Sequence, residues 1–444
     1  MELMFAGLGG LWAGSIFPSC RGGCSNPEGN LGLEPKGKGN GLNLLLILVD
    51  QMRSLIWFSP GMTLPNFEKL RETSLDFTQH FTSAVPCSPS RASLFTGLHS
   101  IVHRVFSNVG EDKSQADLST RLVTLGKVFQ HAGYQTPYFG RWNLSQAKPD
   151  LGDYGFMRMF REYGGAKQEP GLEYDRLCVD AACSWLASKN AAQKWLLTIS
   201  LINPHDIVRY KKLKLEVPEL IAAPPANWND FLENKPSIQK DWSRKDGPED
   251  VRQVKDYLNL YYYYHQQMDR ELGRILDALA GSGCAQNTII VFTSDHGDLA
   301  GSHRLFLKGP CVYDEQNHIP LLIHHPDYRP RAVPALSSNV DLFPTLASLA
   351  GLQLVSSEPL PGLDLAPIIR GESLKLGDRQ IQFFYRWGHY SKQGSPFHID
   401  AVRGSNFVKA RYFNTKDPAG AQYEQYDLRL DPLQMNNLAR NLPD

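Results

Sequence analysis

Polar and ionisable side chains follow four apolar segments of strand length, at the point where each segment ends. The segments are residues 42–49, 134–139, 195–202 and 287–293. In the same order they lead to Asp50-Gln51, to Arg141 and Asn143, to His205, and to Asp295-His296. Because the carboxyl ends of parallel strands share one edge of an open sheet, where ligands bind, we expect these side chains to converge. One such ending would be an ordinary turn, but four in one chain indicate a site.

A cysteine opens the most specific stretch of the chain, residues 86–97 (PCSPSRASLFTG). Ser88 suits a helix N-cap and Pro89 suits the first helical position. Cys87 is thereby predicted to lie just before a helix start, where free N–H groups and the helix dipole favour an anion. Arg91 adds a positive fork one turn later. Taken alone, a cysteine in this position is compatible with a redox thiol or with a buried one.

This stretch resembles the sulfatase signature, Cys-x-Pro-Ser-Arg followed by Thr-Gly, at every defining position. Further family landmarks occur in the expected order: Asp50-Gln51, Pro204-His205, Ser294-Asp295-His296-Gly297, residues 303–315 (HRLFLKGPCVYDE), and Tyr426-Asp427-Leu428 with Asp431-Pro432. The resemblance covers about residues 42–444 and implies an alkaline-phosphatase-like α/β fold. It also implies that a separate maturation enzyme oxidises Cys87 to formylglycine, whose hydrated aldehyde is the nucleophile.

The resemblance places one divalent metal ion on Asp50, Gln51, Asp295 and His296, with the modified Cys87 beside it. Hard oxygen ligands suit Ca²⁺, the first candidate, or Mg²⁺, and the imidazole leaves Mn²⁺ open. Many sulfatases carry Asp where this chain has Gln51, and Asn where it has His296. The pairing found here is similar to that of choline-sulfatase-like and phosphonate-monoester-hydrolase-like members. Without the cysteine motif, Asp295-His296-Gly297 would be interpreted as a polar turn.

Four further roles are implied by the resemblance alone. Arg91 would hold the aldehyde hydrate together with the metal. Lys308 falls where the family places a lysine that contacts the sulfate and the leaving-group oxygen. His205 matches a histidine proposed to protonate the leaving group, and His303 has a family counterpart with a substrate contact as its only suggested role.

Two positions depart from the family pattern Gly-Lys-Trp-His-Leu, which stands here as residues 140–144 (GRWNL). Arg141 keeps the positive charge of the lysine and adds a fork suited to a tetrahedral anion. Asn143 replaces a histidine, which removes a titratable group. One proton-transfer role is therefore in doubt.

Strand-length runs alternate with helical patterns, which predicts a parallel sheet covered by helices. The fold that the resemblance implies has a mixed, mostly parallel sheet sandwiched by helices. Residues 260–280 have helical periodicity, and their tyrosine run at 261–264 is interpreted as helix packing. Residues 42–365 are predicted to form the catalytic domain, with residues 211–255 as a lid-like insertion. Residues 366–444 are predicted to form a small α+β subdomain, with short antiparallel strands at 383–387, 401–404 and 406–413 and a trailing helix that follows residue 426.

Residues 1–41 are interpreted as a leader and linker. The stretch 3–18 is apolar and rich in small residues, as in a secretion signal, but basic residues before it are missing. A truncated export signal, with a periplasmic or lipid-anchored product, and a disordered or mispredicted leader on a cytoplasmic protein both stay open. No apolar run approaches the roughly 20 residues of a transmembrane helix. The seven cysteines are scattered and odd in number, which does not indicate a disulfide framework.

The 46 Lys and Arg residues balance 46 Asp and Glu residues. This balance gives no bulk electrostatic reason to expect nucleic acid or an anionic membrane as a partner. We expect a small-molecule or carbohydrate sulfate ester as substrate, hydrolysed to alcohol and sulfate, and the maturation enzyme as protein partner. A phosphonate monoester or phosphodiester hydrolase of the same superfamily is one alternative, and a non-catalytic anion-binding relative is another. The sequence does not indicate which organic group the sulfate ester carries.

Overall fold

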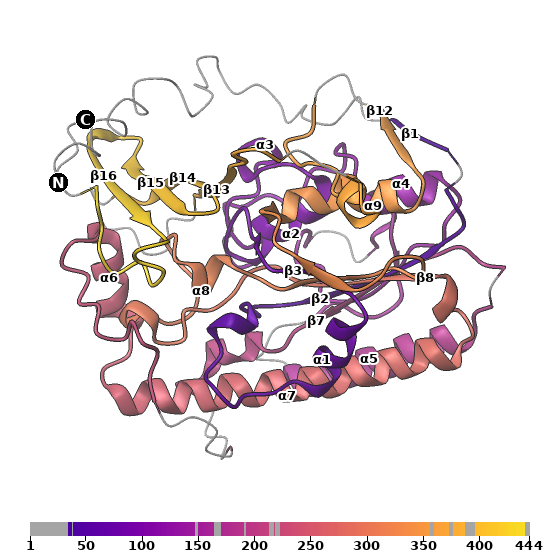
Figure 1. Cartoon of the computed structure of the whole chain (residues 1–444), viewed down its shortest axis with the longest axis horizontal. Coiled ribbons are helices and arrows are strands. Elements are labelled where there is room, and N and C mark those ends of the chain that lie inside the picture. The colour runs from indigo at the N-terminus through magenta and orange to yellow at the C-terminus, as the bar shows by residue number, and fades with distance from the viewer. Residues whose placement is uncertain are drawn as a thin grey trace.

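A computed structural model of the chain describes residues 34–37, 39–146, 150–163, 170–190, 192–212, 217, 223–355, 359–372, 376–386 and 396–439 (Figure 1). Most of the predicted leader therefore lies outside the described residues. Within its last part, β1 (Glu34–Lys36) pairs antiparallel with β12 (Gln353–Val355). Backbone pairing with the rest of the fold thus begins before residue 42.

An eight-stranded sheet forms the centre of the structure, in the order β10-β3-β9-β8-β2-β7-β5-β6. Its strands are β2 (Asn43–Val49), β3 (Leu75–Phe77), β5 (Pro137–Gly140), β6 (Met157–Arg158), β7 (Leu196–Leu201), β8 (Thr288–Ser294), β9 (Leu321–His324) and β10 (Arg331–Val333). The strands β8, β2, β7, β5 and β6 run parallel, whereas β9 is antiparallel to both of its neighbours. The predicted mixed, mostly parallel sheet is confirmed.

Helices cover both faces of this sheet (Figure 1). All seven residues of β2 are buried, and alternate side chains point to opposite faces because successive residues of a strand do so. Leu44, Leu46 and Leu48 pack with α2 (Cys87–Thr96), α4 (Leu125–His131) and α9 (Leu342–Leu349). Leu45, Ile47 and Val49 pack on the other face with α1 (Pro65–Glu72), α5 (Gly171–Ala187) and α7 (Val251–Gly281). A strand buried on both faces explains the unbroken apolar run in the sequence.

Short elements complete this part of the fold. They are the helices α3 (Ser100–His103), α8 (Asp314–Asn317) and α10 (Ala366–Ile369), the pair β4 (His80–Phe81) and β11 (Ser337–Ser338), and the 3-10 helices η2 (Leu55–Trp57), η3 (Gly152–Tyr154), η4 (His205–Arg209), η5 (Ala285–Asn287), η6 (Ser302–Arg304) and η7 (Asn339–Asp341).

The long helix α7 begins earlier than its periodicity predicted. Asp250 caps it by accepting a hydrogen bond from the backbone N–H of Gln253 at 2.8 Å. Three of the four residues of the tyrosine run, Tyr261, Tyr262 and Tyr264, are buried, so their interpretation as helix packing is confirmed.

The lid-like insertion predicted at 211–255 is wrong for the two segments of it that form helices. Residues 237–246 form α6 (Ser237–Asp246), and α7 starts at Val251. Ile238 and Trp242 lie one turn apart on α6 and are fully buried against the C-terminal sheet. The many Lys and Asp residues of this stretch made it look solvent-exposed, so the apolar face of α6 was not predicted.

The C-terminal sheet is antiparallel and contains β13 (Ile381–Tyr385), β14 (His398–Arg403), β15 (Phe407–Asn414) and β16 (Asp417–Asp427). The trailing helix expected after residue 426 is not formed, because residues 428–439 make turns in which side chains bind the backbone. Asn437, for example, donates to the carbonyl of Tyr423 and accepts from the N–H of Gln425. The helix that packs on this sheet is α6, from the middle of the chain.

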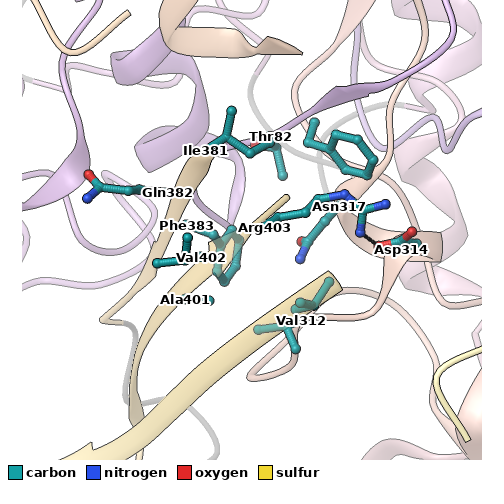
Figure 2. A pocket seen from close by; sticks show the side chains of 12 residues that line it. Thr82, Val312, Asp314, Asn317, Ile381, Gln382, Phe383, Ala401, Val402 and Arg403 are labelled. Atoms are coloured by element: carbon teal, nitrogen blue, oxygen red, sulfur yellow. Dashed lines mark hydrogen bonds and ion pairs between the residues drawn. The ribbon is translucent and has the colours of Figure 1, made fainter. Parts of the chain in front are cut away.

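Where the two sheets meet, Arg403 of β14 reaches across to α8. Its guanidinium lies 2.5 Å from the Asp314 carboxylate and 3.9 Å from the centre of the Phe81 ring. Figure 2 shows this pair in a pocket lined mostly by apolar side chains. This largely buried ion pair joins the C-terminal sheet to α8.

Buried histidines should make the fold sensitive to acid. Burial lowers the pKa to about 3 in His80, His103, His265 and His318 and to about 4 in His99. Unfolded histidines take up protons near pH 6.5, so below that pH the unfolded chain binds more protons than the native one. The free energy of unfolding should therefore fall, by up to about 1.4 kcal/mol per pH unit per histidine.

Urea unfolding between neutral pH and about pH 5 measures this slope. His265→Leu should make it shallower by the share of one histidine, whereas His131→Leu, at an exposed position on α4, should leave it unchanged. A slope that is the same in all three proteins would contradict the expectation.

Candidate active site

Four neighbouring parallel strands deliver the expected side chains to one edge of the sheet. Asp50 follows β2, Arg141 follows β5, His205 follows β7 by a short turn, and Asp295 follows β8. Because β8, β2, β7 and β5 are adjacent in this order, their carboxyl ends lie side by side. The convergence predicted from the sequence is confirmed.

Helix α2 brings Cys87 to the same edge. The helix begins at Cys87 itself, one residue before the predicted cap, and Ser88 does not cap it. Instead the Ser88 hydroxyl donates to the carbonyl of Asn143 at 2.5 Å and accepts from the N–H of Val109 at 3.0 Å. These bonds fix the first turn of α2 against two loops.

The sulfur of Cys87 lies inside a compact group of metal-ligating atoms. It is 3.2 Å from Nε2 of His296 and 3.5 Å from Oδ1 of Asp50. Asp50, Cys87, Asp295 and His296 are all buried, and each offers a ligand atom within 4.8 Å of the others. We call these four residues the carboxylate cluster. Two carboxylates, an imidazole and position 87 could therefore hold a metal ion.

The hydrogen bond of His296 orients its ring as a metal ligand requires. Its Nδ1 lies 2.9 Å from the carbonyl oxygen of Gly297, which can only accept, so we assign the ring proton to Nδ1. The lone pair of Nε2 then faces the cluster. Burial lowers the pKa of His296, which favours the neutral imidazole. This arrangement is the usual one for a histidine that binds a metal.

Arg91 holds the two carboxylates of the cluster together. Its Nε donates to Asp295 Oδ2 at 2.9 Å, and its Nη2 donates to Asp50 Oδ2 at 3.0 Å. Its Nη1 donates to the carbonyl of Arg141 and to the hydroxyl of Ser200, both at 2.8 Å. The guanidinium is fully buried, so its position is fixed by these four bonds.

Arg141 adds a second cation beside Asp50. Its Nη1 lies 2.6 Å from Asp50 Oδ2 and 4.0 Å from the Cys87 sulfur, and its Nη2 lies 4.0 Å from the exposed carboxylate of Glu111. Burial acts to raise the pKa of Asp50, but the charges of Arg141 and Arg91 hold it well below its usual value. Burial and the nearby Asp50 charge raise the pKa of the Cys87 thiol to about 12, which favours the neutral thiol.

Gln51 and Lys308 form a pair next to the cluster. The backbone of Gln51 has a φ of 71° and its N–H donates to Asp295 Oδ1 at 3.1 Å. Its side-chain oxygen accepts from Lys308 Nζ at 2.5 Å. Both predicted residues are therefore at the site, and Lys308 reaches it from the loop after η6.

His205 is buried at the start of η4, within electrostatic range of Asp50, Lys308 and Arg141. Asp175 on α5 fixes the turn before it by accepting from the N–H of Ile202 at 2.7 Å and from that of Asn203 at 2.9 Å. Burial, with Lys308 and Arg141, lowers the pKa of His205 well below its usual value. Its Nδ1 has no hydrogen-bond partner among the described residues.

Asn143 reaches the site through its backbone, since its carbonyl accepts from Ser88 next to Cys87. His303 does not support the suggested substrate contact. Its two ring nitrogens lie 2.7 Å from Asp230 Oδ2 and 3.0 Å from Asn227 Nδ2, so both have protein partners.

Sequence reasoning missed several residues that hold the site in place. Ser90 donates to the carbonyl of Asp295 at 2.5 Å, Ser200 accepts from Arg91, and Asp298 accepts from the Gln51 amide at 2.6 Å. Ser200 lies in β7, where Thr198 is a second hydroxyl residue, so its residue type gave no specific signal. Asp298 follows the Asp-His-Gly stretch directly.

Comparison with known proteins agrees with this geometry. A family model described as "Sulfatase" matches residues 42–352, and one described as "N-sulphoglucosamine sulphohydrolase, C-terminal" matches residues 301–442. The chain belongs to the sulfatase family. It is thus a hydrolase of sulfuric ester bonds, as the sequence resemblance implied.

Relatives of this sulfatase match it over most of their length. Arylsulfatase K of Rattus norvegicus is 25% identical, with 90% of this chain and 75% of that protein covered. A solved 2-O GAG sulfatase superimposes with a TM-score of 0.74 at 23% identity, covering 90% of this chain and 88% of the other. The phosphonate monoester hydrolase of Agrobacterium radiobacter has a TM-score of 0.72 at 23% identity, with 90% and 92% covered. The structural matches confirm the alkaline-phosphatase-like fold.

None of the helices in the described part of this sulfatase has both the length and the apolar character needed to span a membrane.

Removing the Arg91 guanidinium should strongly destabilise the fold. Arg91→Met would leave the Asp50 and Asp295 carboxylates buried without the cation that joins them. Breaking a buried ion pair on one side typically costs about 3–5 kcal/mol. Urea unfolding of the variant should show a loss of this size.

The matched control is Arg176→Met, because Arg176 also pairs with two carboxylates, Glu173 and Asp180, but on the exposed face of α5. Its loss should be much smaller, because ion pairs exposed to water contribute little to stability. Equal losses in the two variants would show that Arg91 is not the joining element.

Proposed function

We propose that this sulfatase cleaves an organic sulfate ester with a formylglycine made from Cys87 and one divalent cation, with Ca²⁺ as first candidate and Mg²⁺ or Mn²⁺ as alternatives. The observation that carries the proposal is the position of the Cys87 sulfur, within 3.5 Å of ligand atoms of both Asp50 and His296. The neutral thiol favoured there is a poor nucleophile, which supports conversion of Cys87 over its direct use. Conversion requires a maturation enzyme as partner.

The residues present fit a hard divalent cation. Asp50 and Asp295 supply charged oxygens, Gln51 supplies an amide oxygen, and His296 supplies the bare Nε2. When bound, the cation would supply Lewis acidity at position 87, where the formylglycine would supply the hydroxyl that attacks sulfur. Arg91 would balance the remaining carboxylate charge.

Cationic side chains would bind the sulfuryl group. Arg141 lies 4.0 Å from the Cys87 sulfur, and Lys308 is held by Gln51 beside the cluster. Fixed donors in a buried site stabilise negative charge that grows on the oxygens in the transition state. Arg141 offers a planar fork for this purpose and Lys308 a point charge.

We assign the proton donor for the leaving alkoxide to His205. Its Nδ1 is buried without a partner among the described residues, so it is available for a substrate atom. A bound sulfate ester adds negative charge next to the ring, which counteracts the lowering of its pKa by burial, Lys308 and Arg141. Asn143 would orient a hydroxyl near position 87 but cannot take its proton at neutral pH.

As domain boundaries we propose residues 42–365 for the catalytic domain and residues 366–444 for the C-terminal subdomain, after the leader and linker of residues 1–41. The antiparallel sheet of residues 381–427 supports the second boundary. For the substrate we propose a small-molecule or carbohydrate sulfate ester. Export of the protein is proposed from the apolar residues 3–18.

Cys87→Ala should fold normally and lose essentially all hydrolysis, because no side-chain atom remains that can become the nucleophile. Denaturation curves check the fold, and release of a chromogenic phenol from an aryl sulfate checks the activity. Mass spectrometry of the peptide that contains residue 87 should show formylglycine in the active wild type. A wild type with unconverted cysteine and no turnover would favour the non-catalytic anion-binding relative.

Turnover of an aryl sulfate and of an aryl phosphonate monoester with the same phenol distinguishes sulfate-ester hydrolysis from phosphonate or phosphodiester hydrolysis. We expect a higher kcat/KM for the sulfate. The reverse order would favour the phosphonate or phosphodiester hydrolase, which uses the same nucleophile.

Chelation should abolish turnover, and addition of Ca²⁺ should restore it. Asp295→Asn should raise the Ca²⁺ concentration needed, since a hard cation loses a charged oxygen ligand. Elemental analysis of the purified protein gives the metal content. Full activity in chelator with no metal detected would contradict the assignment.

A further inference from the structure

The side-chain amide of Gln51 lies between two groups of opposite hydrogen-bonding character. Lys308 Nζ is 2.5 Å from one end of the amide, and Asp298 Oδ2 is 2.6 Å from the other. An ammonium group can only donate and a carboxylate can only accept. The amide oxygen must therefore face Lys308 and the amide nitrogen must face Asp298. The two neighbours settle an orientation that heavy-atom positions alone leave ambiguous.

Asp298 is itself firmly held. It is fully buried, and its Oδ1 accepts from the N–H of Ala300 at 2.7 Å. Its Oδ2 accepts from the hydroxyl of Tyr257 at 2.8 Å, in addition to the Gln51 amide. Tyr257 belongs to α7 and Asp298 to the loop after β8, so two separate elements fix this carboxylate. Three donors compensate for its burial.

We propose that Asp298 is a positioning residue, which holds the Gln51 amide with its oxygen toward Lys308 and the carboxylate cluster. This inference rests on the proposed function, in which the Gln51 oxygen is a metal ligand. An amide turned by half a rotation would present N–H groups to Lys308 and to the cation. Partners that orient a metal ligand from behind typically contribute about 10–100-fold to metal affinity.

The first variant is Asp298→Asn, tested with Ca²⁺ as the probe. The asparagine keeps the size of the side chain and an oxygen for the N–H of Ala300. Its own amide nitrogen then faces that of Gln51, and two donors oppose each other. The Ca²⁺ affinity of the full chain, measured by titration calorimetry after removal of bound metal, should fall about 10–100-fold.

A reversed pair separates positioning from general damage. Gln51→Glu alone places two carboxylates 2.6 Å apart, which favours protonation or displacement of one of them. Adding Asp298→Asn restores a donor and an acceptor, with the roles exchanged. Asp298→Asn should therefore weaken Ca²⁺ binding when residue 51 is Gln and strengthen it when residue 51 is Glu. A change in the same direction in both backgrounds, or none in either, would overturn the inference.

Asp269→Asn is the matched control. Asp269 is also a buried carboxylate, on α7, and it accepts from an asparagine amide, Asn66 Nδ2, at 3.1 Å and from the N–H of Phe67 at 2.7 Å. The variant should unfold at lower urea concentration yet keep the Ca²⁺ affinity of the wild type. An equal loss of affinity in Asp269→Asn would refute a specific role for Asp298. A wild type that binds no divalent cation would instead remove the proposed metal site, and the role of Asp298 with it.

Discussion

The rest of the site depends on the two ion pairs that the Arg91 guanidinium forms with Asp50 and Asp295. Asp50 and Asp295 follow different strands, and two buried carboxylates so close together would repel each other without a cation between them. The same guanidinium binds Ser200 of β7 and the backbone at Arg141, after β5. It thus fastens four strand ends to the helix whose first residue is Cys87. One side chain therefore links the helix that carries the cysteine to both carboxylates.

The charges around the cluster explain why the site suits an anion. Arg91, Arg141 and Lys308 are buried beside Asp50 and Asp295, with the Asp298 carboxylate behind Gln51. Three positive and three negative side chains leave the protein part close to neutral. The proposed divalent cation would make the site positive, and a sulfate ester would carry the negative charge that compensates for it. Low effective dielectric strengthens this attraction compared with water.

Much of this arrangement could be predicted because it follows from order along the chain. The unbroken apolar run of β2 and the polar residues after it were enough to place Asp50, and three more strand ends followed the same rule. Residues that only hold other site residues in place by hydrogen bonds were harder to find. Ser200 and Asp298 have no signal of their own, since a serine in a strand or a second aspartate in a loop is common. The expected helix after residue 426 failed because Asn437 binds the backbone of β16, a contact that depends on the tertiary fold.

The pairing of β1 with β12 fixes the position of the first described residues relative to the active site. These strands lie at the upper right in Figure 1, and the chain then runs through Asn43 at the amino end of β2, whereas Asp50 stands at its carboxyl end. Seven extended residues span roughly 20 Å. In a shortened chain that starts at Glu34, a surface, bead or fusion partner attached to that residue would therefore lie on the side of the sheet edge opposite the reaction centre. Immobilised in that way, the enzyme would keep the carboxyl ends of its parallel strands turned toward bulk solution.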